Sequence, residues 1–96
     1  MSVDEQLQSK RQQILRTAAR HGARNVRLFG SAAQGEATSE SDVDFLVDVE
    51  PEHSAWFPAG LVAELEELLG CNVDVVTEES LHWYIRDRVL EEAVPL

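Results

Sequence analysis

Residues 28–49 read LFGSAAQGEATSESDVDFLVDV. One apolar run ends at Gly30-Ser31, and a polar connection rich in turn-forming residues leads to a second apolar run, which contains Asp42 and Asp44. Side chains two apart in a strand point to the same face, so the two carboxylates lie side by side and repel each other. Their burial needs compensation. An exposed strand start is the simpler interpretation, and a bare Asp-x-Asp favours it.

Three neighbouring features favour a nucleotide and metal site instead. Gly30-Ser31 lies at a strand-to-turn junction, where a small residue lets backbone N–H groups approach a phosphate and Ser31 can donate a hydroxyl hydrogen bond. Gly35 gives the turn freedom to double back. Asp74 lies inside another apolar run, NVDVV, and joins the first two carboxylates if the two strands are neighbours.

Three converging carboxylates predict one or two Mg²⁺ ions, because Mg²⁺ is held by a few carboxylates together with substrate phosphates. Such a site fits nucleotidyl transfer from a nucleoside triphosphate, in which catalysis is mostly positioning and electrostatics. We expect Asp42 and Asp44 to bind the metal. Asp74 is expected to accept the proton of the attacking hydroxyl or to bind metal as well. Gly30 and Ser31 are the expected nucleotide-binding residues.

Hydrophobic periodicity predicts helices and strands in alternation. The expected helices span residues 4–21, 59–69 and 81–93, the expected strands span residues 25–29, 42–49 and 72–76, SAAQG makes a helical turn, and Val94-Pro95-Leu96 ends the chain. The helix before the third strand suits a crossover connection. We therefore expect an α/β (α+β) fold with a small mixed β-sheet packed with helices, in one domain over residues 1–96.

The charge is strongly acidic and unevenly distributed. The net charge is −10, which argues against direct DNA binding, because duplex recognition needs a basic surface. Between Arg27 and Arg86 there is no Lys or Arg but there are thirteen Asp or Glu residues. Such a segment repels a nucleotide unless a cation intervenes, and it also attracts a basic protein partner. For most of the Glu residues a solvated surface is the better interpretation.

From the remaining features we expect a cytoplasmic protein, and the roles of two aromatic residues stay open. The single Cys71 excludes an internal disulfide and is expected to be a small buried hydrophobic residue. The N-terminus has no apolar signal core, and no run approaches the roughly 20 apolar residues that span a membrane. Trp83 and Tyr84 fit the core and an interface equally well. We expect Trp56 and Phe57 to pack in a loop and His21 to lie at the surface.

The signature Gly-Ser-x10-Asp-x-Asp, from Gly30-Ser31 through Asp42 and Asp44, resembles that of the nucleotidyltransferase (DNA polymerase β-like) superfamily. Three segments within residues 10–96 resemble the minimal nucleotidyltransferase (MNT) family, namely LFGSAAQGEATSESDVDFLVDVEP, LEELLGCNVDVVTEESL and IRDRVLEEAVPL. The resemblance implies the nucleotidyltransferase fold and an antitoxin paired with a HEPN-domain ribonuclease toxin. Family members use Mg²⁺ and transfer AMP from ATP onto a tyrosine of that toxin.

Carried over residue by residue, the resemblance implies that Gly30 and Ser31 bind triphosphate, that Asp42 and Asp44 are metal ligands, and that Asp74 is the third carboxylate. The chain departs from the family at Gln34 and Ala32, where Arg is often found. Gln carries no charge for a phosphate or a partner, which bears on nucleotide affinity and on the strength of catalysis.

Two other functions stay open at this point. In the first, the antitoxin works by binding and masking the toxin, with weak or no catalysis. In the second, AMP is transferred to a small molecule such as an aminoglycoside. Enzymes that modify small molecules usually carry an additional helical domain for the acceptor. We expect no such domain within these 96 residues, so we rank transfer to a small molecule third.

Overall fold

The computed structural model describes residues 3–38, 42–53, 55 and 57–96. In chain order the elements are α1 (Val3–Ser9), α2 (Arg11–Arg20), β1 (Ala23–Phe29), η1 (Gly30–Gln34), β2 (Val43–Val49), α3 (Ala59–Leu69), β3 (Val73–Val76), η2 (Glu78–Ser80), α4 (Trp83–Glu92) and β4 (Val94–Pro95). The elements η1 and η2 are short 3-10 helices. None of the helices in these described ranges is long and apolar enough to cross a membrane.

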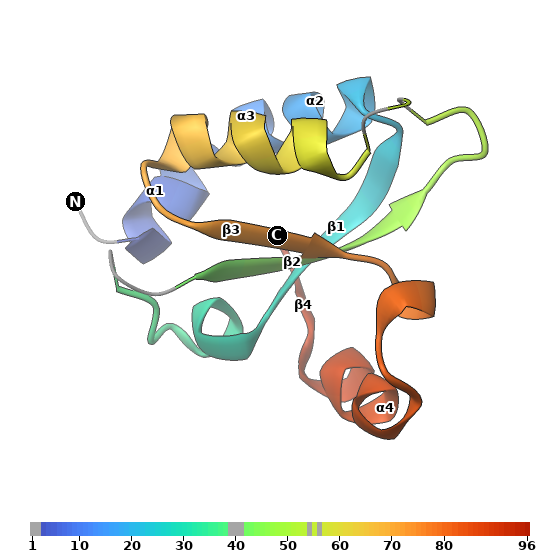
Figure 1. The fold of residues 1–96 in the computed structure, drawn as a ribbon. Helices are drawn as coiled ribbons and strands as arrows, with labels where there is room; N and C mark the ends of the chain where they lie inside the picture. Colours follow the sequence, from blue (N-terminus) through green and yellow to red (C-terminus); the bar gives the residue numbers. More distant parts are fainter. Residues whose placement is uncertain (1–2, 39–41, 54, 56) are drawn as a thin grey trace.

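The four strands form a mixed sheet in the order β3-β2-β1-β4. Strand β1 runs antiparallel to β2 and to β4, whereas β2 and β3 run parallel. The predicted mixed sheet is therefore confirmed, and α3 is the crossover that a parallel pair requires. Figure 1 shows α1, α2 and α3 on one face of the sheet, while η1 and α4 lie on the other side.

The core lies between the sheet and the layer of α1, α2 and α3. Strand β2 buries Val43, Phe45 and Val47 on the helix-facing side, as its alternation predicts. Leu46, on the opposite face, is also fully buried, so the central strand is covered on both sides. Helix α3 supplies the facing stripe at four-residue steps, namely Leu61, Leu65 and Leu69.

The single helix predicted over residues 4–21 is wrong, because the chain breaks at Lys10 into α1 and α2. Lys10 leaves helical geometry with φ −103° and ψ 12°. Its Nζ atom donates a hydrogen bond of 2.7 Å to the carbonyl of Leu68, near the C-terminal end of α3. A cation is favourable at that end of a helix. Leu7 of α1 and Ile14 of α2 are both buried on either side of the break.

One strand, β4, was not predicted from the sequence. Val94 and Pro95 form β4, with Val94 opposite Leu28 of β1. The N–H of Leu96 then donates to the carbonyl of Val26 at 3.1 Å. A two-residue strand is too short to show periodicity, and Pro is tolerated here because β4 is an edge strand. Its Pro also blunts that edge of the sheet against pairing with another chain.

Candidate active site

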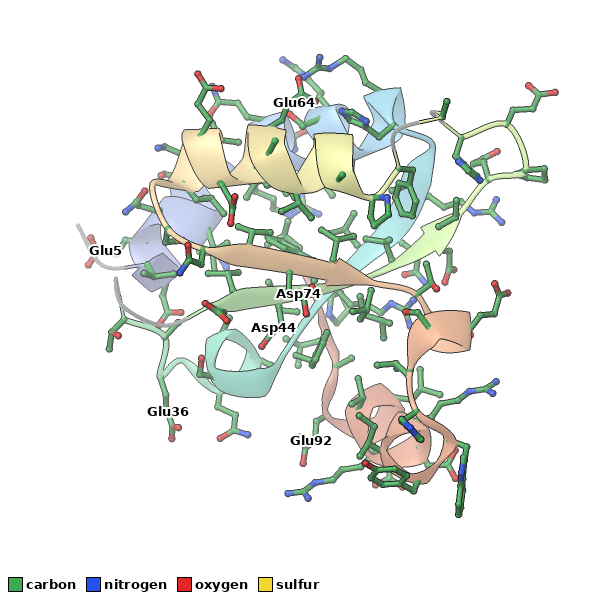
Figure 2. All side chains as sticks on the ribbon, in the orientation of Figure 1. Glu5, Glu36, Asp44, Glu64, Asp74 and Glu92 are labelled. Carbon is green, nitrogen blue, oxygen red and sulfur yellow. The ribbon has the colours of Figure 1, made fainter. Side chains whose placement is uncertain are left out.

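The predicted site residues meet at the end of the sheet where β1 stops and where β2 and β3 begin. We call this end of the sheet the carboxylate edge. Strand β1 ends at Phe29, which lies opposite Asp44 near the start of β2. Asp44 in turn lies opposite Asp74 near the start of the parallel strand β3. Neighbouring residues in register point to the same face, and Figure 2 shows both carboxylates on the face of the sheet that is turned away from α1, α2 and α3.

Gly30 explains how Asp44 fits at this edge. Gly30 has φ +69°, a left-handed conformation that favours glycine, and it begins η1 directly after β1. A Cβ atom at this position would lie 2.7 Å from Oδ2 of Asp44. The carboxylate therefore lies against the bare Cα of Gly30, and no larger residue leaves this space free. Gly35, with φ +72°, closes the turn as predicted.

Every influence on the ionisation of Asp44 acts in the same direction. Burial is the largest influence that raises the pKa of Asp44, followed by the negative charge of Asp74 and then that of Asp42. All three influences disfavour the ionised form. Asp44 is half-buried, whereas Asp74 is exposed. Asp42 lies just before β2 and is exposed as well.

The donor set fits an open Mg²⁺ site and not a closed cage. In the described ranges, no three His, Cys, Asp or Glu side chains are arranged as a ready-made metal site. Mg²⁺ needs no such cage, since it usually binds one or two carboxylates and completes its shell with water and substrate phosphates. Asp44, crowded by the charges of Asp74 and Asp42, offers hard oxygen ligands whose repulsion a divalent cation would relieve.

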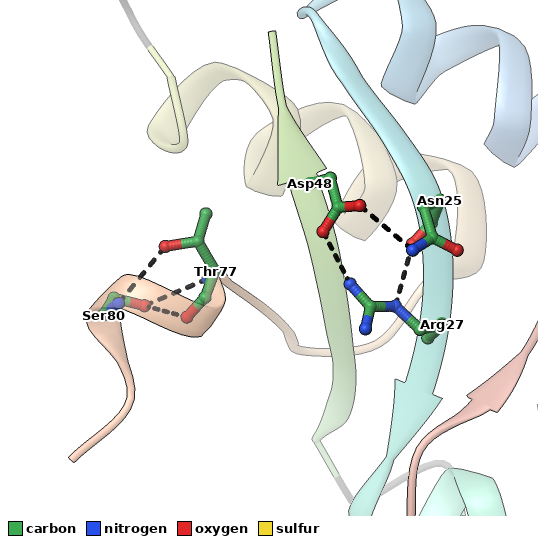
Figure 3. A network of polar contacts seen from close by, with 5 residues as sticks. All are labelled: Asn25, Arg27, Asp48, Thr77 and Ser80. Atoms are coloured by element: carbon green, nitrogen blue, oxygen red, sulfur yellow. Dashed lines mark hydrogen bonds and ion pairs between the residues drawn. The ribbon is translucent and has the colours of Figure 1, made fainter. Parts of the chain in front are cut away.

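A polar network that was not predicted from the sequence lies further along β1 and β2 (Figure 3). Arg27 Nη2 donates to Asp48 Oδ1 at 2.9 Å, and Asn25 Nδ2 donates to Asp48 Oδ2 at 3.0 Å. Arg27 Nε also donates to the carbonyl of Asn25 at 3.1 Å. Asn25 has φ +49°, and the register shifts between Arg24 and Arg27, as in a β-bulge.

This bulge sets the register of β1 where it approaches the site. Arg24 and Arg27 lie three residue steps apart along β1, but their partners Asp48 and Leu46 lie only two steps apart along β2. The extra residue keeps Phe29 opposite Asp44. Bulges often lie next to active sites, where they re-aim side chains. The one signal in the sequence is Asn25, because Asn tolerates positive φ better than most residues.

The two departures from the family pattern occupy different environments in η1. Ala32 is buried and belongs to the hydrophobic core. Gln34 is exposed near the end of η1. A long charged side chain at Ala32 would have to leave the core, whereas one at Gln34 would point into solvent beside the site.

The other residues weighed from the sequence lie outside this site. Phe57 packs against the core, as predicted, and Trp56 lies outside the described residues. His21 is not at the surface as expected, because its side chain is only 15% exposed and contacts the carboxylate of Glu64. The hydrogen bond from His21, helped by the charge of Arg20, lowers the pKa of Glu64. This pair ties α2 to α3 on the far side of the sheet.

Cys71 is half-buried just before β3 and packs against the core. Burial, and then the charges of Glu66 and Asp42, raise the pKa of its thiol. A thiol of this kind is a weak nucleophile at neutral pH. The prediction that Cys71 is a small hydrophobic residue agrees with this environment.

Comparison with known proteins agrees with this geometry. The model of the nucleotidyltransferase domain family matches residues 10–96. Protein adenylyltransferase MntA of Thermococcus cleftensis is 45% identical over 75 residues, which cover 78% of this chain and 76% of that protein.

Solved structures show the same fold. One, provisionally described as a minimal nucleotidyltransferase, superposes with a TM-score of 0.86 at 46% identity and covers 100% of this chain and 97% of that chain. Another is a mutant of the toxin–antitoxin complex MntA-HpeT, with a TM-score of 0.69, 26% identity and coverage of 93% of this chain and 70% of that chain. The chain therefore belongs to the nucleotidyltransferase domain family, and its fold is that of a minimal nucleotidyltransferase.

Proposed function

We propose that this chain is a Mg²⁺-dependent protein adenylyltransferase of the cytoplasm, with residues 1–96 acting as one domain. It transfers AMP from ATP to a tyrosine of a cognate HEPN ribonuclease toxin and so acts as the antitoxin. The observation that carries the proposal is the meeting of Gly30, Asp44 and Asp74 at one edge of the sheet. The relative named protein adenylyltransferase MntA and the MntA-HpeT toxin–antitoxin complex support it. The HEPN identity and the tyrosine rest on the family resemblance alone.

The triphosphate binds at the start of η1 in this proposal. Gly30 and Ser31 offer backbone N–H groups and the Ser31 hydroxyl to the phosphate oxygens. No Lys or Arg occurs between Arg27 and Arg86, so the residues of this segment carry no positive charge to balance the phosphates. Mg²⁺, held by Asp42 and Asp44 with Asp74 as a third carboxylate, supplies that positive charge when it is bound.

The chain's own residues position the reactants and take up the proton. The tyrosine oxygen attacks the α-phosphorus of ATP, the bond from that phosphorus to the bridging oxygen breaks, and pyrophosphate leaves. The phenolic proton passes to Asp74, which is exposed and lies next to Asp44 in the register of the sheet. Asp44 is fixed by its packing against Gly30, which keeps its oxygens in place.

Masking of the toxin without transfer is the second candidate. The observation that favours it is the absence of a positive charge at Ala32 and Gln34 of η1, where the family often has Arg. The acidic segment between Arg27 and Arg86 suits a basic protein partner whether or not transfer occurs.

Intact-mass spectrometry of the toxin, incubated with this protein, ATP and Mg²⁺, separates the two candidates. We expect the wild type to add one or more AMP units and D42N/D44N to add none. The control E52Q/E67Q changes the charge equally at two exposed positions outside the site and should transfer normally. Transfer by D42N/D44N would refute the assigned site. A stable complex with no transfer by the wild type would establish the masking antitoxin.

A further inference from the structure

Helix α4 exposes aromatic residues that a folded chain normally buries. Trp83 is 81% exposed, Tyr84 66%, Ile85 39%, and Val94 of β4 38%. Every residue of α4, all within the described ranges, is exposed or half-buried. The rings contact each other, since the Trp83 and Tyr84 centroids lie 5.8 Å apart in an edge-on arrangement. We call Trp83, Tyr84 and the adjacent Ile85 the α4 surface.

No element in the described part of the chain covers this surface. A ten-residue helix is marginal in water without packing. Exposed apolar groups of this size are characteristic of interaction sites, and Trp and Tyr are over-represented among the residues that dominate binding energy. The sequence left core and interface open for Trp83 and Tyr84, and the structure places both outside the core.

The position of α4 relates this surface to the site. Helix α4 lies beside η1, the element that follows β1 and contains Gly30 and Ser31. It lies on the same side of the sheet as Asp44 and Asp74, opposite the layer of α1, α2 and α3 (Figures 1 and 2). A protein docked on α4 is therefore held next to the carboxylate edge.

Charge complementarity selects the occupant. Residues 78–96 carry five acidic and two basic side chains, and one of the two, Arg88, pairs with Glu92. The whole chain has a net charge of −10. A second copy of this chain brings the same charge and is repelled, whereas a basic protein is attracted and steered to the surface.

We infer that the α4 surface docks the protein that receives AMP, a partner with an apolar patch ringed by Lys and Arg. The inference rests on the proposed adenylyl transfer and names where its acceptor binds. Docking on α4 supplies affinity for the acceptor, while η1 and the carboxylates bind the nucleotide.

The test first identifies the acceptor and then varies the surface. The protein is incubated with α-labelled ATP and Mg²⁺ in an extract of the organism that encodes it, and the labelled acceptor is purified. KM for that acceptor and kcat are then measured for the wild type, W83S/Y84S and W83F/Y84F. The phenylalanine variant keeps the apolar surface and removes the tyrosine hydroxyl, so it is the matched control. Affinity for ATP is measured for all three.

We expect W83S/Y84S to raise KM for the acceptor by about tenfold or more, as loss of an aromatic anchor does. Its kcat and its affinity for ATP should be unchanged, and W83F/Y84F should match the wild type. An unchanged KM overturns the inference, and so does an equal loss of ATP affinity, which would assign the rings to the nucleotide. A dimer that W83S/Y84S dissociates without a change in KM assigns the surface to a second copy. Failure to label any protein instead refutes the proposed transfer itself.

Discussion

Replacing Gly30 with Ala tests whether the contact between Gly30 and Asp44 positions the site. The new Cβ would lie 2.7 Å from Oδ2 of Asp44, and ordinary contact begins at 3.4 Å, so the carboxylate must retreat by about 0.7 Å. Misplacement of a reacting group by about 1 Å can cost about 100-fold in rate. We therefore expect G30A to lose between one and two orders of magnitude in kcat/KM for AMP transfer.

Gly70 provides a control with the same backbone strain. Its φ is also +69°, at the end of α3, but a Cβ there would meet no atom within 4 Å. Both G30A and G70A should lose about 1–2 kcal/mol of unfolding free energy, because an L-residue is strained in this conformation. Only G30A should also lose activity.

Urea unfolding followed by fluorescence gives the stability of each variant, and the rate of AMP transfer to the toxin gives the activity. If G30A is as active as G70A, the reasoning is wrong, because Asp44 then tolerates displacement or is not needed. If both variants lose activity equally, strain and not the contact with Asp44 controls the site.

Three further predictions follow from contacts outside the carboxylate edge. R27A should cost about 1–2 kcal/mol in unfolding free energy and should slow AMP transfer, because the β-bulge loses the hydrogen bonds that Arg27 donates to Asp48 and to the carbonyl of Asn25; R27K should recover only part, as measured by urea unfolding and transfer assays. The lowered pKa of Glu64 means that its contact with His21 stabilises the fold fully above the ordinary glutamate pKa of about 4.3, and that this contribution is lost as the pH falls below it; E64Q should therefore flatten the pH dependence of unfolding between about pH 3 and 5, and an unchanged slope would contradict the pairing. The Cys71 thiol should react with a disulfide reagent more slowly than free cysteine at pH 8, and E66Q should speed the reaction; a rate above that of free cysteine would show that its pKa is not raised.

The parts of the fold that local pattern controls could be predicted from the sequence. Alternating Val43, Phe45 and Val47 predicts β2, and the leucines that end at Gly70 predict α3, because each pattern reflects one buried face. The Gly-Ser turn was predicted from its turn-forming residues, and the placement of Asp74 beside Asp44 from the crossover that makes their strands neighbours. The roles of these residues in metal binding and catalysis stay predictions.

The parts that depend on distant partners could not be predicted. The break at Lys10 has no Gly or Pro to mark it, and its side chain bonds to Leu68, which is far away in the sequence. The bulge at Asn25 depends on Asp48 of the neighbouring strand. Strand β4 exists because β1 offers it an edge, and no pattern within two residues reports that. Each of these features is a tertiary contact that overrides local propensity.

The family signature contains only part of the site, because Asp74 comes from β3, which pairs with β2 in parallel. Gly30-Ser31 and Asp44 follow each other along the chain, but Asp74 reaches Asp44 only after α3 has crossed over the sheet. A fragment that ends before β3 would contain the whole Gly-Ser…Asp-x-Asp signature and still lack the third carboxylate. Closing so long a connection is slow compared with forming a hairpin. A chain in which β3 has not yet paired with β2 therefore carries the recognisable motif without the third carboxylate.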